Sequence, residues 1–382
     1  MGNEAAVLIV ALSGRALAAS ARRGGYVPLV ADVFGDVDTL NAAHRHVRFA
    51  GGLASGIEER DLIDALQILS EGQEPIGVVY GTGFEDRPQL LQRMAERWRL
   101  LGNGADVVAK LKNPKIFSSI CSDFGIPTPE ISLPEPASRS GWLAKRQGGA
   151  GGAHIQPADD SADTRGAIYY QRRVPGTPIA ACFLADGERA RVLGFSAQWS
   201  SPTPRQPYRY GGAVRPAPLA PGTADKLIAA VQWIVGATSL VGLNSADFLV
   251  DGERFWLLEI NPRPGATLDI FETTETSLFA QHVAACSGQL AAASGCAENA
   301  KAASIVYAEE DIASVSVSAW PDWVADLPMA GSAIKAGDPI CTVYACDLAA
   351  EAAGIDRTNR VTGFDRRSRH RQIGDPVRPG RY

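Results

Sequence analysis

The sequence lacks an uninterrupted hydrophobic run of the roughly 20 residues that are needed to cross a bilayer. Its first apolar segment, AAVLIVAL, is short, follows Glu4 and is closely followed by Arg15. A secretory signal peptide would instead carry basic residues before a longer apolar core. We therefore expect this segment to be the first β-strand of a cytoplasmic protein that has no membrane partner.

Paired cysteines and an excess of positive charge are also missing. The six cysteines form no CxxC pair and have no histidine at zinc-ligand spacing, so we expect reduced thiols rather than disulfides or a zinc site. The net charge of −5 and the pI near 5.7 argue against a nucleic-acid partner. The basic C-terminal segment, residues 357–381, contains Asp365 and Asp375, which favours a solvated tail. Small molecules are the expected ligands.

The chain does have the length and composition of a soluble enzyme with two or three domains, with 382 residues of which 46% are hydrophobic. Residues 1–105 alternate strand and helix patterns, which predicts a parallel sheet covered by helices. Ser13 and Gly14 begin the first helix, where their amides could hold an anion or simply cap the helix. The predicted strands span residues 6–12, 26–33 and 76–83, and the predicted helices span 13–25 and 62–69.

From residue 106 onward the pattern changes. A helix is expected from Pro114 to Phe124, ending before GIPTPE, and antiparallel hairpins with further helices follow to about residue 272. After residue 296, short strands separated by Gly/Pro turns predict a small β domain. The expected fold class is therefore α/β followed by α+β.

Residues 255–265, FWLLEINPRPG, carry the strongest chemical signal. Glu259 and Asn261 lie two apart at the end of a predicted strand, so both side chains face the same side of the sheet. A carboxylate beside an amide oxygen, with Arg263 close by, suits a Mg²⁺ ion bound to phosphates. The alternative is an ordinary salt bridge between Glu259 and Arg263 at a strand end.

A glycine-rich stretch, GGAGG at residues 148–152, follows Lys145. Glycines let backbone amides approach phosphate oxygens closely, and the lysine adds a positive charge. The stretch alone is also compatible with a flexible hairpin turn, and it lacks the GK[ST] ending of a P-loop.

The order of these motifs resembles the ATP-grasp superfamily of ligases, in the biotin-carboxylase-like carboligase group. Asp247 and Glu259 are 12 residues apart, as in the metal-binding hairpin of that branch. The resemblance implies an ATP-grasp fold with a Rossmann-like N-terminal domain and a small C-terminal β domain. The implied domains are residues 1–105, an ATP-grasp domain at 106–295 with lobes 106–173 and 174–295, and a β domain with a basic tail at 296–382.

The resemblance also implies site residues and cofactors. ATP would be bound with one or two Mg²⁺ ions, or Mn²⁺, and Arg263 and Lys145 would act on the transferred phosphoryl group. The implied metal ligands are Asp247, Glu259 and Asn261. The implied nucleotide contacts are Lys115, Lys145, Gly148, Gly149, Gly151, Gly152, Gln171, Arg172, Arg173 and Val174.

The implied reaction joins a carboxylate to an amine through an acyl phosphate and releases ADP and phosphate. A role as a glutamate ligase in one-carbon coenzyme biosynthesis is one candidate. A non-catalytic nucleotide-binding regulator and another ATP-grasp carboligase, such as a carboxylase, remain alternatives. A homodimer is the assembly to consider.

Substrate contacts are sought in the Pro/Arg/Tyr-rich segment 201–216 and in YGTGFED at residues 80–86. An arginine can bind a carboxylate through two hydrogen bonds. The alternative, that the segment is a surface loop whose arginines have no role in binding, is almost equally compatible with the sequence. His154 could be a base, or a structural histidine. The candidate substrate residues are Arg205, Tyr208, Arg209, Tyr210 and Glu85, with Arg215 in the same segment.

Overall fold

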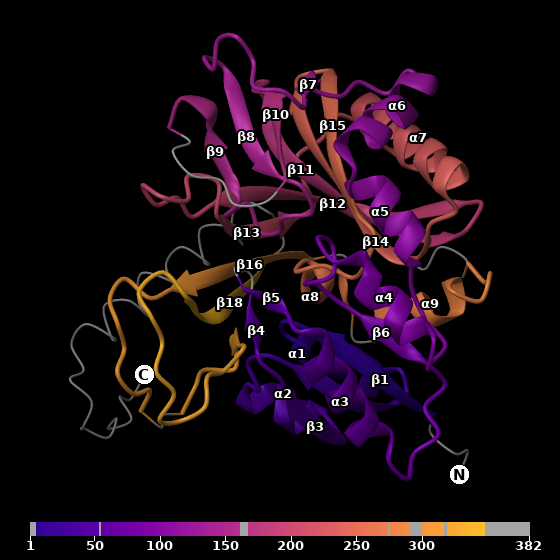
Figure 1. The fold of residues 1–382 in the computed structure, drawn as a ribbon, viewed down its shortest axis with the longest axis vertical. Coiled ribbons are helices and arrows are strands. Elements are labelled where there is room, and N and C mark those ends of the chain that lie inside the picture. The colour runs from indigo at the N-terminus through magenta and orange to yellow at the C-terminus, as the bar shows by residue number, and fades with distance from the viewer. Residues whose placement is uncertain are drawn as a thin grey trace.

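A computed structural model describes residues 5–52, 55–160, 167–273, 276–290, 299–316 and 319–347. The N-terminal region, residues 5–95, lies at one end of the molecule, and the region from residue 105 to 261 lies at the other (Figure 1). The strands β16 (Ala300–Tyr307) and β18 (Pro339–Asp347) lie beside the place where the two regions meet. The basic tail considered above lies outside the described residues. None of the helices in the described residues combines the length and the apolar character that crossing a bilayer requires.

The N-terminal region is the parallel sheet that the sequence predicted, with strand order β3-β2-β1-β6. Side chains of β1 alternate between two cores: Leu8 and Val10 pack toward α3 and α4, and Val7 and Ile9 pack toward α1 and α9. The elements are β1 (Ala6–Ala11), α1 (Arg15–Arg23), β2 (Val27–Asp32), α2 (Val37–Ala42), β3 (Arg45–Arg48), β4 (Gly51–Gly52), β5 (Gly56–Ile57), α3 (Glu59–Ser70), β6 (Val78–Tyr80) and α4 (Pro88–Ala95).

Two helices and a small antiparallel sheet of order β7-β10-β8-β9 follow. The predicted helix at Pro114 begins with that proline at its first turn, where a missing N–H costs nothing, and Asn113 caps it by accepting from the amides of Lys115 and Ile116. The elements are α5 (Ala105–Lys112), α6 (Pro114–Asp123), β7 (Ile131–Ser132), β8 (Trp142–Arg146), β9 (Ile155–Pro157), a short 3₁₀ turn (Ala158–Asp160) and β10 (Ile168–Arg172).

A large sheet of order β15-β14-β11-β12-β13-β16-β18-β17 completes the fold. The strands after residue 296 extend this sheet, because β16 pairs with β13 and then with β18. The helix α7 covers one face through Leu227, Val231 and Ile234. The elements are β11 (Thr177–Asp186), β12 (Ala190–Ser200), β13 (Tyr210–Arg215), α7 (Pro221–Thr238), β14 (Val241–Asp251), β15 (Arg254–Asn261), α8 (Leu268–Phe271), α9 (Leu278–Ala285), β16 (Ala300–Tyr307), β17 (Val324–Ala325) and β18 (Pro339–Asp347).

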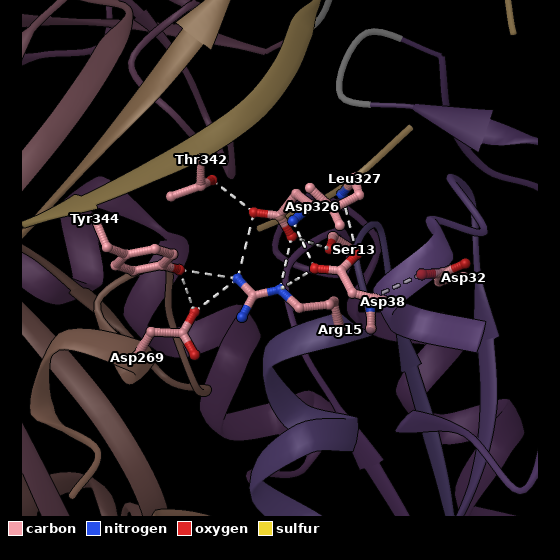
Figure 2. A network of polar contacts seen from close by, with 10 residues as sticks. Ser13, Arg15, Asp32, Asp38, Asp269, Asp326, Leu327, Thr342 and Tyr344 are labelled. Atoms are coloured by element: carbon pink, nitrogen blue, oxygen red, sulfur yellow. Dashed lines mark hydrogen bonds and ion pairs between the residues drawn. The ribbon is translucent and has the colours of Figure 1, made fainter. Parts of the chain in front are cut away.

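Arg15, a largely covered arginine, links the N-terminal region with α8 and with the last strands (Figure 2). Arg15, at the start of α1, places Nη2 2.7 Å from Oδ2 of Asp269 on α8 and Nε 2.9 Å from Oδ1 of Asp326 beside β17. The Tyr344 hydroxyl from β18 accepts from Arg15 at 3.0 Å and donates to Asp269 at 2.6 Å. We call these four residues the Arg15 junction. Burial opposes the charge of Arg15, but the carboxylates outweigh it and raise the pKa of the guanidinium.

Ser13 and Gly14, at the start of α1, both contact carboxylates of the protein itself. The amide of Gly14 donates to Oδ2 of Asp32 at 3.0 Å, and the Ser13 hydroxyl lies 3.5 Å from Oδ1 of Asp326. Asp32 therefore takes up the Gly14 amide, and Gly14 is the N-cap residue of α1 without a side-chain capping hydrogen bond.

Candidate active site

A cavity of about 490 Å³ lies between α5, α6, the small sheet and β15. Apolar side chains form part of its wall, and polar side chains and the glycine-rich loop form the rest. It is lined by Leu111, Lys112, Pro114, Phe117, Ser118, Thr128, Pro129, Ile131, Arg146, Gly148, Gly149, His154, Tyr169, Gln171, Leu258 and Glu259.

The three predicted metal ligands, Asp247 on β14 and Glu259 and Asn261 on β15, lie close together beside this cavity. Asp247 is paired with Glu259 across the two strands, and a bulge follows immediately after Asp247. Nδ2 of Asn261 donates to Oδ2 of Asp247 at 2.9 Å. The two carboxylates and the amide therefore gather within one polar patch.

The lysine that reaches this patch is Lys112, which the sequence prediction missed. Its Nζ lies 3.1 Å from Oε2 of Glu259 and 3.0 Å from Oδ1 of Asn261, and the residue is 8% exposed. Lys115, predicted for this role, is exposed on α6 and does not line the cavity. The break at Asn113 and Pro114 is the physical reason, because it ends α5 at Lys112 and restarts the chain as α6.

The charges in the patch are unevenly balanced. Burial opposes ionisation of Glu259, but the charges of Lys112 and Lys145 outweigh it and lower its pKa. For Asp247, burial and the nearby charge of Glu259 raise the pKa. Two partly buried carboxylates that repel each other, beside an amide oxygen, form a donor set that fits Mg²⁺, which takes one or two protein carboxylates together with phosphate oxygens.

Lys145 lies on β8 and is 4% exposed. Its Nζ donates to Oε1 of Gln171 at 3.2 Å and sits 5.9 Å from the ring centre of Tyr169. Burial lowers its pKa, but Tyr169 and Glu259 outweigh burial and the pKa is raised, so the amine remains a cation. Of the predicted hinge residues 171–174, Gln171 lines the cavity, whereas the side chains of Arg172 and Arg173 are exposed and Val174 is outside the lining.

The glycine-rich loop is held on both sides. A Cβ on Gly148 would lie 2.6 Å from Cα of Asp86, and a Cβ on Gly152 would lie 1.9 Å from the carbonyl oxygen of Tyr208. Gly151 accepts a hydrogen bond from the Tyr210 amide at 2.9 Å. The loop therefore passes between the N-terminal region and the segment before β13.

His154 packs its ring against Gly149, where a Cβ would lie 2.2 Å from the ring. Burial lowers its pKa to about 4, so the imidazole is neutral near pH 7. It lines the cavity, and its Nδ1 is buried without a hydrogen-bond partner among the described residues.

Residues 110–267 match the ATP-grasp domain family, and this span contains the cavity's lysines, its glycine loop and its acidic patch. The chain contains an ATP-grasp domain. The sequence-based assignment to the ATP-grasp superfamily is thereby confirmed, and no curated protein matches the chain in sequence.

Solved structures share the whole ATP-grasp architecture. An ADP complex of N5-carboxyaminoimidazole ribonucleotide synthetase is 16% identical, with a TM-score of 0.70 over 96% of this chain and 99% of that one. An L-amino acid ligase from Bacillus licheniformis is 15% identical, with a TM-score of 0.68 over 95% and 98%. A biotin carboxylase complex from Campylobacter jejuni is 15% identical, with a TM-score of 0.68 over 88% and 87%. These similarities establish the predicted fold class.

Arg263 follows the end of β15 by two residues and forms an ion pair with Glu85 of the N-terminal region. Its Nε donates to Oε1 of Glu85 at 2.7 Å, and both side chains are buried. Oε2 of Glu85 accepts from the amides of Gly83 and Phe84. Glu85 was predicted to contact an amine or substrate; in this structure both its oxygens are occupied within the protein, so it positions Arg263 instead.

The predicted substrate segment is also used largely for structure. Arg209 donates to carbonyls of Ser201 and Gly337 and stacks 3.6 Å from the ring centre of Tyr307. Arg215 donates to the carbonyls of Ile270 and Asn299. These two arginines anchor the segment to the large sheet, which corrects their prediction as carboxylate-binding groups.

The other three candidates differ in burial. Arg205 is exposed, Tyr208 is half-buried, and Tyr210 is half-buried with a pKa that burial and the charge of Asp247 raise. Tyr210 is therefore the member of the segment whose ring lies in the electrostatic environment of the acidic patch. None of the three lines the nucleotide-sized cavity.

Proposed function

We propose that the protein is an ATP- and Mg²⁺-dependent ligase that joins a carboxylate to an amine and releases ADP and phosphate. The observation that carries the proposal is the convergence of Lys112, Glu259, Asn261 and Asp247 at one edge of the cavity in the ATP-grasp domain. Lys112 and Lys145 would neutralise phosphate charge, and the apolar part of the cavity wall would hold the base.

The metal would be held by Asp247, Glu259 and Asn261, as one or two Mg²⁺ ions or Mn²⁺. When bound, it would neutralise charge on the phosphates, as in other phosphoryl-transfer enzymes. Lys112 now bonds both Glu259 and Asn261, so it would have to share these oxygens with the metal or turn toward the phosphates.

The reaction would proceed in two balanced steps. A carboxylate oxygen attacks the terminal phosphorus, the bond to the bridging oxygen breaks, and ADP leaves with the electron pair. The amine nitrogen then attacks the acyl carbon, phosphate leaves, and the nitrogen loses a proton. The protein contributes mainly position and charge compensation, which are the main sources of catalysis for such transfers.

The amide-forming reaction is supported by the likeness to an L-amino acid ligase and by the resemblance to carboligases of one-carbon coenzyme pathways. An amino acid such as glutamate is the carboxylate we expect. The protein would act in the cytoplasm, alone or as a homodimer.

The experiment is incubation of the protein with MgATP, an amine and ¹⁸O-carboxylate glutamate, with other amino acids in parallel. One ¹⁸O per turnover in the released phosphate, together with ADP, would support an acyl phosphate. A requirement for bicarbonate, with unlabelled phosphate, would favour a carboxylase. AMP formation would contradict both. Nucleotide binding without turnover on any amino acid would favour a regulatory protein.

A further inference from the structure

A second, smaller cavity lies on the N-terminal side of the glycine-rich loop and has a volume of about 290 Å³. It shares Arg146 and Gly148 with the nucleotide cavity, so the two cavities meet at these residues. Glycines from both regions form much of its wall, which leaves backbone rather than bulky side chains facing the space. It is lined by Leu12, Gly52, Gly56, Gly83, Glu85, Asp86, Arg146, Gly148 and Ala150.

Arg146 is the last residue of β8 and the cationic side chain that lines both cavities. Its Nε is buried and has no hydrogen-bond partner, and among the described residues its guanidinium forms no ion pair. The buried arginines Arg209 and Arg263 behave differently, since both donate to protein oxygens. A buried donor without a partner costs about 1–3 kcal/mol unless a ligand satisfies it.

Two other charged side chains line the smaller cavity, Glu85 and Asp86. Asp86 forms no ion pair with Arg146 among the described residues, and Glu85 is already paired. Glu85 is neutralised by Arg263 and two amides, and Arg263 is itself occupied by Glu85. Arg146 therefore supplies an unused positive charge at the junction of the two cavities. A guanidinium binds carboxylates and phosphates through two parallel hydrogen bonds, which an ammonium cannot do.

We propose that the smaller cavity holds the carboxylate substrate and that Arg146 binds this carboxylate and the acyl phosphate made from it. The proposal rests on the proposed function and assigns its substrate-binding group. When the carboxylate oxygen takes the terminal phosphoryl group and the bond to ADP breaks, the product spans the junction. Arg146 faces both sides of that junction and can hold the new phosphate oxygens. The glycine-lined wall, which leaves backbone facing the space, suits a small organic acid.

The test uses the reverse half-reaction, which requires no knowledge of the natural acid. The full-length protein is given MgADP with carbamoyl phosphate or acetyl phosphate, and ATP formation is measured. Arg146→Gln removes the charge, Arg146→Lys keeps the charge without the fork, and Arg60→Gln is the control because that side chain is 91% exposed on α3. Calorimetry measures MgADP affinity and, in the presence of MgADP, acetyl phosphate affinity.

We expect Arg146→Gln to lower ATP formation and acetyl phosphate affinity at least tenfold while MgADP affinity stays within threefold of wild type. Arg146→Lys should recover part of the loss, and Arg60→Gln should match wild type. Unchanged acetyl phosphate affinity in Arg146→Gln would overturn the assignment, as would an equal loss of MgADP affinity. A wild-type protein that binds acetyl phosphate through Arg146 but makes no ATP would instead overturn the proposed ligase chemistry.

Discussion

Lys112 Nζ lies 3.1 Å from Oε2 of Glu259. Lys112 precedes the strands of the small sheet in the sequence, and Glu259 follows them. Lys112→Ala should weaken MgATP binding by about ten- to a hundredfold, because a lost charge-assisted contact is worth roughly 1.5–3 kcal/mol. Lys115→Ala is the matched control, because Lys115 follows Lys112 by three residues and its side chain is exposed. Calorimetry with a non-hydrolysable ATP analogue gives both affinities. Equal losses in the two variants would contradict the position assigned to Lys112.

Glu259→Gln should abolish ATP-dependent turnover, because the substitution removes the charge that would hold the metal next to the phosphates. The fold should persist, since the amide can still accept a hydrogen bond from Lys112. Glu253→Gln, on the exposed turn between β14 and β15, is the control. Steady-state ADP release and circular dichroism test the two halves of the prediction. Activity near wild type in Glu259→Gln would refute the metal site.

Gly152→Ala should impair the glycine-rich loop more than Gly151→Ala. Both glycines have positive φ, +71° and +66°, so an alanine is strained at either position. A Cβ on Gly152 would also lie 1.9 Å from the Tyr208 carbonyl oxygen, whereas a Cβ on Gly151 meets nothing within 4 Å. We expect at least tenfold lower kcat/KM for ATP in Gly152→Ala than in Gly151→Ala. Matching values would show that contact with Tyr208 is unnecessary.

Glu85→Gln should destabilise the protein by about 3–5 kcal/mol, because it leaves the Arg263 cation buried without its partner. Urea unfolding measures the change, and Glu96→Gln in an exposed pair with Arg93 should cost at most about 1 kcal/mol. Burial opposes ionisation of Glu85, yet Arg263, Lys112 and an amide outweigh it and lower its pKa. The stabilisation is therefore present above the unfolded-state pKa of about 4.3 and is lost at lower pH. A stability difference that does not shrink in acid would argue against the ion pair.

Asp36 makes stability depend on pH in the opposite direction. Burial, with the negative charges of Asp326, Asp32 and Asp38, raises its pKa from 3.8 to about 7, although Arg15 partly offsets them. The folded state then binds a proton that the unfolded state releases, so stability falls as pH rises from about 4 to 7. Asp36→Asn should remove up to about 4 kcal/mol of this loss at pH 8.

The measurement for Asp36→Asn is the unfolding midpoint at pH 5 and pH 8. The gain over wild type should be larger at pH 8, and Asp61→Asn on the exposed face of α3 should show no such change. Parallel pH profiles for wild type and Asp36→Asn would refute the raised pKa.

The sequence predicted what depends on local periodicity and spacing. The parallel sheet follows from alternating strand and helix patterns. The position of Glu259 and Asn261 on the same face follows from their separation by two residues on one strand. Local spacing could not show whether Lys112 or Lys115 lines the cavity, because this depends on where the helix break at Asn113 ends α5 and begins α6.

Long-range pairing was beyond the sequence for a similar reason. The Glu85–Arg263 ion pair joins residues 178 positions apart, and neither residue carries a local signal of the other. Arg146 is adjacent to the predicted Lys145, but its position between the two cavities depends on the packing of distant segments, which the local sequence does not encode.

The attachment of β16 to β13 has a practical consequence for anyone who dissects this protein into fragments. Register pairs run from Gly212 with Ser304 to Arg215 with Lys301, so the C-terminal strands protect an edge that would otherwise offer free amides and carbonyls. A fragment that stops near residue 295 would expose that edge, and an uncovered flat edge recruits strands from neighbouring molecules. Such a fragment should aggregate during expression even though it retains residues 110–267, so the ATP-grasp domain is best studied with its C-terminal strands attached.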